Sequence, residues 1–314
     1  MQPIYRALAQ GLTKTCLAND LGGCSGKIIR AHSLQKAAFS PHARNGHVYE
    51  FDPFQIRDNG ITPTLIGVNK ATTFTGFCER HDASLFAPIE VETFKANPQQ
   101  LFLHHYRAIA QAFYNRAYKF KILEQALTEN AAKVGKAAAR RFEEDMQINR
   151  VEVQELMRHK RLCEQNLMGM NWAEVVGFCW KGKSAPDIFA TDFFAPRKDF
   201  LGSTLQDCKS LAPLQWISLT VTASDNCAVV LLCAAKGSKI LKSCAESLRR
   251  IPNNLRTMSL VNFIVCQLEN FIMLPKWWDP LSEDAKRLVV NAYTSRYFPR
   301  KLPRICDWTL SAAT

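Results

Sequence analysis

The chain has 314 residues, of which 47% are hydrophobic and 22% are charged, with 14 Gly and 14 Pro. This length allows two ordinary domains or one large one, and the composition excludes collagenous and disordered chains. Forty Lys and Arg against 28 Asp and Glu give a net charge of +12, which favours anionic partners such as nucleic acid.

The N-terminus and the apolar stretches predict the compartment. The first residues, MQPIYRALAQGLTKTC, lack the charged start and apolar run of a secretion signal. The longest apolar stretches, AVVLLCAA and VNFIVCQLENFIM, are too short or too interrupted by polar residues to span a bilayer, so we expect no membrane segment. We therefore expect a cytoplasmic protein whose eleven cysteines are thiols or metal ligands.

Residues 1–100 have the pattern of short strands joined by turns. Turn dipeptides occur at Gly22-Gly23 and Asn45-Gly46, and strand candidates lie at 27–31 and 47–51. Such short strands are expected where something other than a large apolar core fixes the backbone. This region also holds three of the eleven cysteines and four of the seven histidines.

Residues 101–168 predict two long helices. This stretch contains no proline and a single glycine, Gly135. Its apolar residues recur at steps of three and four, as on one face of a helix: Tyr106, Ile109, Phe113, Ala117, Phe120 and Leu127. The stripe dissolves around Gly135, which favours two antiparallel helices over one continuous rod.

Beyond residue 170 the pattern changes to strands followed by helices. Strand-like runs occur at 172–180, 215–223 and 227–234, each bounded by Gly, Pro, Asp or Asn. Helices are predicted at 238–250 and at 283–297, the second capped by Ser282. We expect the adjacent Trp277 and Trp278 to close a hydrophobic layer.

Four residues of the N-terminal region form a candidate zinc site. Cys16 and Cys24 supply the first pair, and Cys78 and His81 supply the second in the spacing Cys-x-x-His, which lets one turn present both side chains to one ion. The alternative is that these cysteines are ordinary buried thiols. The other eight cysteines show no such spacing, so we expect each to be a core thiol.

The order of these residues resembles the HNH endonucleases, whose ββα-metal fold is often braced by a treble-clef zinc. The resemblance covers roughly residues 12–90 and is carried by CSGKIIRAHSLQKA and FCERHDASLF. It implies that His32, at the end of the first strand, is the general base, and that Asp82, after the second ligand pair, binds a catalytic Mg²⁺ or Mn²⁺. Two features depart from the family: Ala31 replaces a metal-binding Asp or His, and threonines stand where an orienting asparagine usually lies.

Two histidines in the loop that follows, His42 and His47, could add a ligand, although surface histidines are the commoner explanation.

Together these patterns predict an α+β protein with a zinc-braced ββα domain at 1–100, a helical hairpin at 101–170 and a mixed α/β domain at 171–314. The resemblance implies a metal-dependent nuclease acting on DNA or RNA, with a restriction or anti-phage role. The alternative is a non-catalytic zinc module that binds nucleic acid or a partner protein. A homo-oligomer or a protein partner would use the helical or C-terminal region.

Overall fold

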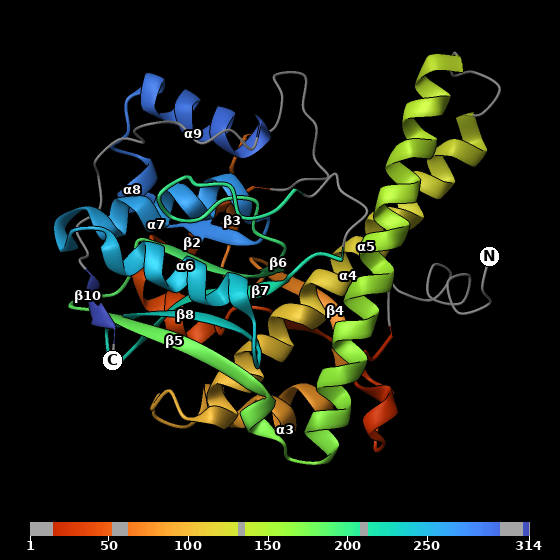
Figure 1. The fold of residues 1–314 in the computed structure, drawn as a ribbon, viewed down its shortest axis with the longest axis horizontal. Coiled ribbons are helices and arrows are strands. Elements are labelled where there is room, and N and C mark those ends of the chain that lie inside the picture. Colours follow the sequence, from red (N-terminus) through yellow and green to blue (C-terminus); the bar gives the residue numbers. More distant parts are fainter. Residues whose placement is uncertain (1–14, 52–61, 131–135, 208–212, 296–309, 314) are drawn as a thin grey trace. The chain divides into compact units, whose positions relative to one another are not determined.

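The computed structural model describes residues 15–51, 62–130, 136–207, 213–295 and 310–313 (Figure 1). The chain is a mixed α+β protein, as the sequence predicts. Its described residues form two compact units that interleave along the sequence. The first unit takes residues from 1–31, 74–87 and 109–172, and the second takes residues from 32–73, 88–108 and 173–314.

The first unit contains a two-stranded sheet and long helices. Strands β1 (Ile28–His32) and β4 (Thr73–Cys78) form the sheet, and β4 leads directly into α3 (Glu79–Glu90). The strands run antiparallel, because the Glu79 N–H after β4 donates to the Lys27 carbonyl before β1, 2.9 Å away. At the other end of the pair, the Ser33 N–H donates to the Thr72 carbonyl, also at 2.9 Å. The predicted strand at 27–31 is therefore confirmed as β1.

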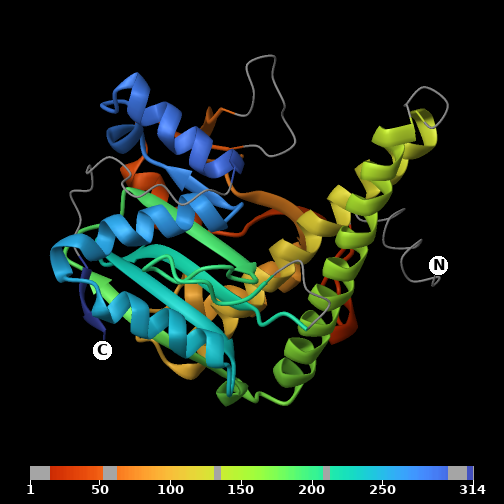
Figure 2. The ribbon, with the colours of Figure 1, turned by 45° about the horizontal axis from the view of Figure 1, so that its top comes forward.

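Two helices of 33 residues each, α4 (Pro98–Asn130) and α5 (Lys136–Met168), confirm the predicted helical pair. They run antiparallel: Arg116 pairs with Glu152 at 3.1 Å, and four residues further along α4 the Phe120 ring lies under Arg150 (Figure 2). Phe113 is 2% exposed, so the apolar stripe is a packing surface. The expected break near Gly135 and the side chain of Leu127 lie outside the described residues.

The second unit is built on an eight-stranded antiparallel sheet with the order β10-β5-β8-β7-β6-β9-β2-β3. Its strands are β2 (His47–Glu50), β3 (Thr64–Gly67), β5 (Val175–Gly182), β6 (Ile188–Phe194), β7 (Ile217–Ser224), β8 (Cys227–Ala235), β9 (Phe271–Met273) and β10 (Leu310–Ala313). The predicted strands at 47–51, 172–180, 215–223 and 227–234 correspond to β2, β5, β7 and β8. Asp225 and Asn226 join β7 to β8 with φ angles of 49° and 60°, as a tight hairpin turn requires.

Helices α6 (Lys239–Arg250) and α7 (Asn253–Gln267) lie across one face of this sheet (Figures 1 and 2). Central strand β7 is buried on both faces: Ile217, Leu219 and Val221 share a core with α6 and α7, and the alternate residues include the buried Ser218. Ser218 Oγ lies 2.8 Å from His105 Nδ1 of α4, so the first turns of α4 cover the opposite face. The short helices α2 (Lys36–Phe39), α8 (Pro275–Trp278) and η3 (Ser40–His42) complete the unit with α9 (Glu283–Ser295).

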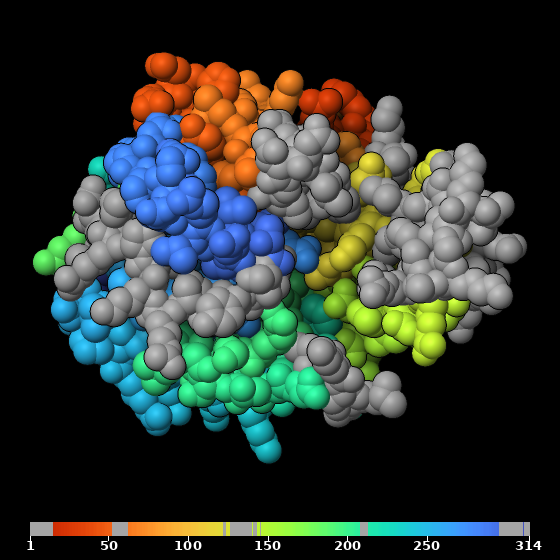
Figure 3. Space-filling model, turned by 90° about the horizontal axis from the view of Figure 1, so that it is seen from above, coloured from red at the N-terminus to blue at the C-terminus, as the bar shows by residue number. Residues whose placement is uncertain are grey.

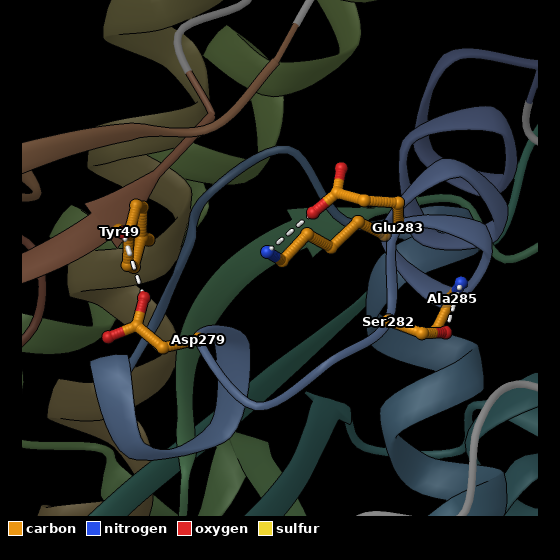
Figure 4. Close-up of polar contacts among 6 residues, drawn as sticks. Tyr49, Asp279, Ser282, Glu283 and Ala285 are labelled. Atoms are coloured by element: carbon orange, nitrogen blue, oxygen red, sulfur yellow. Dashed lines mark hydrogen bonds and ion pairs between the residues drawn. The ribbon is translucent and has the colours of Figure 1, made fainter.

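Local sequence signals in the second unit are confirmed. Ser282 caps α9 as predicted, with its hydroxyl oxygen accepting the Ala285 N–H at 3.3 Å (Figure 4). Ser238 caps α6 in the same way and accepts the Leu241 N–H at 3.2 Å. The two tryptophans of α8 are buried, as expected.

The C-terminal helices are joined to the N-terminal strands of the same unit. The Tyr49 hydroxyl on β2 donates to Asp279 Oδ1 at 2.9 Å (Figure 4), and Arg44 pairs with the same carboxylate at 2.6 Å. In the space-filling view, the blue segment that holds α9 lies at the surface beside orange-red N-terminal residues (Figure 3).

Candidate metal centre

The four predicted ligands lie together in the first unit. The Sγ atoms of Cys16, Cys24 and Cys78 and a ring nitrogen of His81 all lie within 4.8 Å of one another, and Cys16 Sγ is 3.1 Å from His81 Nδ1. Cys16 and Cys78 are buried, and Cys24 is partly exposed. Among the described residues, no other group of three or more His, Cys, Asp or Glu side chains could hold a metal ion.

Backbone contacts bring the two ligand pairs together. The Leu17 N–H donates to the Gly76 carbonyl at 2.8 Å, which ties the residue after Cys16 to strand β4. The Cys78 N–H points at Cys16 Sγ at 3.4 Å, and the His81 N–H points at Cys78 Sγ at the same distance. N–H groups directed at sulfur stabilise the thiolate, and the thiolate is the form that binds a metal ion, so these backbone contacts favour metal binding.

The loop between the first two cysteines orients the histidine. His81 Nε2 lies 2.8 Å from the Gly22 carbonyl oxygen. A carbonyl can only accept, so Nε2 carries the proton and the lone pair of Nδ1 faces Cys16. Gly22 has φ 77° and ψ 167°, a conformation open almost exclusively to glycine. The Gly22-Gly23 dipeptide therefore forms the predicted turn and also places the carbonyl that orients the His81 ring.

The thiols of Cys16 and Cys78 differ in acidity. Burial raises the pKa of Cys16 to about 12; the backbone N–H groups of Cys78 and Ala18 oppose this shift, and the Cys78 side chain adds to it. Burial also opposes ionisation of Cys78, but hydrogen bonds from Ser25 and from the His81 N–H outweigh it and lower its pKa to about 6. Without an ion the centre thus stabilises one thiolate, and a bound divalent metal would hold the second sulfur deprotonated as well.

This donor set fits a tetrahedral ion. Three sulfurs and one imidazole nitrogen form a set typical of structural zinc, whose bonds to sulfur and nitrogen are about 2.3 Å and 2.0 Å. Bonds of that length place the ligand atoms on one ion roughly 3.5–3.8 Å apart, within the 4.8 Å span of the cluster. Four protein ligands leave no open position for a substrate, so such a site stabilises the fold and does not catalyse.

His32, the predicted general base, ends β1 and belongs to the second unit. Its ring lies against Phe39 with centroids 6.2 Å apart, and its Nδ1 is buried without a hydrogen bond to any described atom. Burial lowers the pKa of His32, and the positive charges of Lys36 and Arg107 lower it further. The polar backbone of Ala71 and the Glu90 carboxylate raise this pKa and so act in the opposite direction. With this lowered pKa the imidazole ring is uncharged near pH 7, and an uncharged imidazole can accept a proton.

Asp82, the predicted ligand of a catalytic ion, lies in the first turn of α3 and belongs to the first unit. The two candidate extra ligands lie elsewhere in the second unit. The His42 ring stacks on Phe189 with centroids 6.2 Å apart, and His47 Nδ1 lies 2.7 Å from the Asn45 carbonyl oxygen.

Comparison with family models, curated proteins and solved structures finds no match to this chain. Among the described helices, none combines the length and apolar character needed to cross a membrane.

Proposed function

We propose that this protein is a zinc-stabilised, metal-dependent nuclease of the HNH type, acting on DNA or RNA in the cytoplasm. The main support is the path of the chain around the ligand cluster. A first ligand pair precedes β1, β1 pairs antiparallel with β4, and β4 delivers the second pair at the start of α3. That order is the one expected of a treble-clef ββα module, and it puts His32 at the end of the first strand.

In this proposal the chain's own residues have separate tasks. Cys16, Cys24, Cys78 and His81 hold zinc, which fixes β4 and α3. His32 takes a proton from water through Nδ1, the ring nitrogen that makes no hydrogen bond to any described atom. Asp82 is the proposed carboxylate ligand of Mg²⁺ or Mn²⁺, an ion that supplies charge stabilisation on the phosphate oxygens when bound. The net charge of +12 favours association with the phosphate backbone.

The zinc is tested by elemental analysis of the purified full chain. We expect one zinc per chain and its loss in Cys78→Ser. The matched control is Cys163→Ser, which changes a buried thiol of α5 in the same unit and should retain the metal. Metal-free protein with unchanged thermal stability would contradict the structural role.

The nuclease is tested on plasmid DNA and on RNA with Mg²⁺ or Mn²⁺. His32→Ala should abolish cleavage while zinc content and thermal stability stay nearly unchanged, because the loss is of proton transfer. His47→Ala, a change at an exposed histidine of β2, should cleave normally. Wild-type protein that leaves both nucleic acids intact would refute catalysis.

One observation favours a second candidate, a non-catalytic zinc module that binds nucleic acid or protein. The residue before His32 is Ala31, which is 1% exposed and offers no ligand. In that case nucleic acid should be bound but not cleaved, and His32→Ala should leave the binding unchanged.

A further inference from the structure

Helix α6 of the second unit carries a cationic face. Its apolar side chains are buried in the core that it shares with the sheet, and its exposed positions include four cations: Lys239, Lys242, Arg249 and Arg250. Because successive residues turn by about 100°, these four lie within one sector of roughly 100° around the helix. Four cations less the one carboxylate of Glu246 give α6 a charge of +3, a quarter of the net +12 of the chain, in 12 of 314 residues.

Most of these charges are unpaired within the described part of the chain. No described carboxylate lies within ion-pair distance of Lys239, Lys242 or Arg249, and Arg250 reaches Glu246 only at 4.0 Å. Like charges three or four residues apart on a helix repel each other. An anion bound along this face would relieve that repulsion.

The stability of the helix explains only half of the positive charge. Arg249 and Arg250 stand in the last turn, where cations interact favourably with the helix dipole. Lys239 and Lys242 are the first and fourth residues of α6, at the end where the dipole disfavours cations, and the first turn holds no acidic residue. The two lysines therefore cost stability in the protein alone, whereas an anion along the helix would stabilise them.

The Arg249 guanidinium is ordered by an aromatic ring. Its Cζ lies 4.8 Å from the centroid of the Phe178 ring on β5, a cation–π distance. Phe178 is itself partly buried against the core of the second unit. The planar guanidinium can donate two hydrogen bonds to one phosphate, and a side chain that is already ordered loses less entropy on binding.

We propose that the exposed face of α6 binds the phosphate backbone of a nucleic acid and so holds the substrate of the proposed nuclease, the function on which this inference rests. From Lys239 to Arg250 the cations span about 16 Å, too far to converge on one small anion. A nucleic acid duplex carries one phosphate charge per about 1.7 Å of its axis and so supplies anions along this whole length. None of the exposed residues of α6 is apolar, so the face lacks the side chains that insert into a lipid surface.

A double substitution on α6, with a matched control on α9, tests this surface. Lys242→Gln with Arg249→Gln removes one lysine and one arginine from α6. Lys286→Gln with Arg287→Gln removes the same charges from α9, where both cations are in ion pairs. Binding of each full-length protein to labelled duplex DNA and duplex RNA is measured by fluorescence anisotropy without Mg²⁺ or Mn²⁺, as the salt concentration is raised.

We expect the α6 double variant to bind about 10- to 50-fold more weakly than wild type at about 0.1 M salt. The slope of log K against log salt should become shallower by about 2, because each phosphate contact contributes roughly 0.9. Lys242→Gln alone, which leaves the Arg249 contact with Phe178 intact, should reduce the slope by about 1. The α9 variant should stay within about two-fold of wild type. Equal losses in both double variants, or no loss in the α6 variant, would overturn the proposal, as would wild type that binds phosphatidylserine vesicles but neither nucleic acid.

Binding and cleavage separate this inference from the proposed function. Wild type that binds nucleic acid through α6 but does not cleave it refutes only the nuclease. Wild type that cleaves, while the α6 variant binds as tightly as wild type, refutes only the binding surface. Equal thermal midpoints of the variants and wild type show that weaker binding reflects lost phosphate contacts and not unfolding.

Discussion

Substituting Gly76 in strand β4 tests whether close packing in this strand holds the metal centre in place. A Cβ added there would lie 2.4 Å and 2.6 Å from the Phe74 ring and 3.1 Å from Leu17 Cδ1. The ring has little room to move, because it is 5% exposed and packs on Phe77 and Tyr114 at centroid distances of 5.7 Å and 5.5 Å. Glycine at this position therefore permits the close approach of the Phe74 ring to the strand.

The expected cost of Gly76→Ala follows from two opposing terms. Overpacking a filled core destabilises by about 1–3 kcal/mol, and replacing glycine stabilises by roughly 0.4–1 kcal/mol through the unfolded chain. We therefore expect a net loss of about 1–2 kcal/mol. The Gly76 carbonyl also accepts the Leu17 N–H, and Cys78 lies two residues further on, so zinc should be removed faster by a chelator.

A matched control is available in the same kind of element. Gly67 ends strand β3, and a Cβ there would have its nearest neighbour, His47 Nε2, at 4.0 Å. Gly67→Ala should leave stability unchanged or slightly higher. Both variants are compared by urea denaturation and by the rate of zinc transfer to a chelator. Equal stability of Gly76→Ala and wild type would refute the packing argument.

Two further predictions concern charge. The Lys160–Glu164 pair of α5 is buried with Nζ and Oε1 2.6 Å apart, so Glu164→Gln should lower the free energy of unfolding by about 3 kcal/mol, whereas Glu144→Gln in the exposed pair with Arg140 should change it by less than about 0.5 kcal/mol. Similar effects in urea denaturation would contradict the role of burial. Burial also lowers the pKa of four histidines from 6.5: His32, His42, His104 and His159, with the pKa of His104 falling to about 3. Below pH 6.5 these histidines bind protons in the unfolded chain but stay neutral in the folded chain. The free energy of unfolding should therefore be highest above pH 6.5 and fall as the pH drops below that value. Urea denaturation between pH 7.5 and pH 5.5 measures this, and replacing His159 with glutamine should flatten the dependence.

Much of the local structure follows from the sequence, because the interactions that fix it act within a few residues. The Cys-x-x-His spacing places Cys78 and His81 within one turn, and the apolar repeat identifies the two long helices. Ser238 and Ser282 cap helices through N–H groups only three residues ahead. The approach of Cys16 and Cys24 to the second pair could also be predicted, since the residue types of a zinc site restrict how it can assemble.

Only the tertiary structure determines which distant segments pair. β2 lies between β3 and β9, so it joins the chain near residue 50 to the chain near residue 272, a pairing that no local pattern specifies. The same holds for the closeness of the Phe74 ring to Gly76 and for the positive φ of Thr72, whose threonine carries no turn signal. These features depend on register and packing across long sequence separations, where many alternatives share one hydrophobic pattern. The sequence therefore determined the ligands and the helices, and the long-range contacts decided how β1, β4 and the residues around His32 are held.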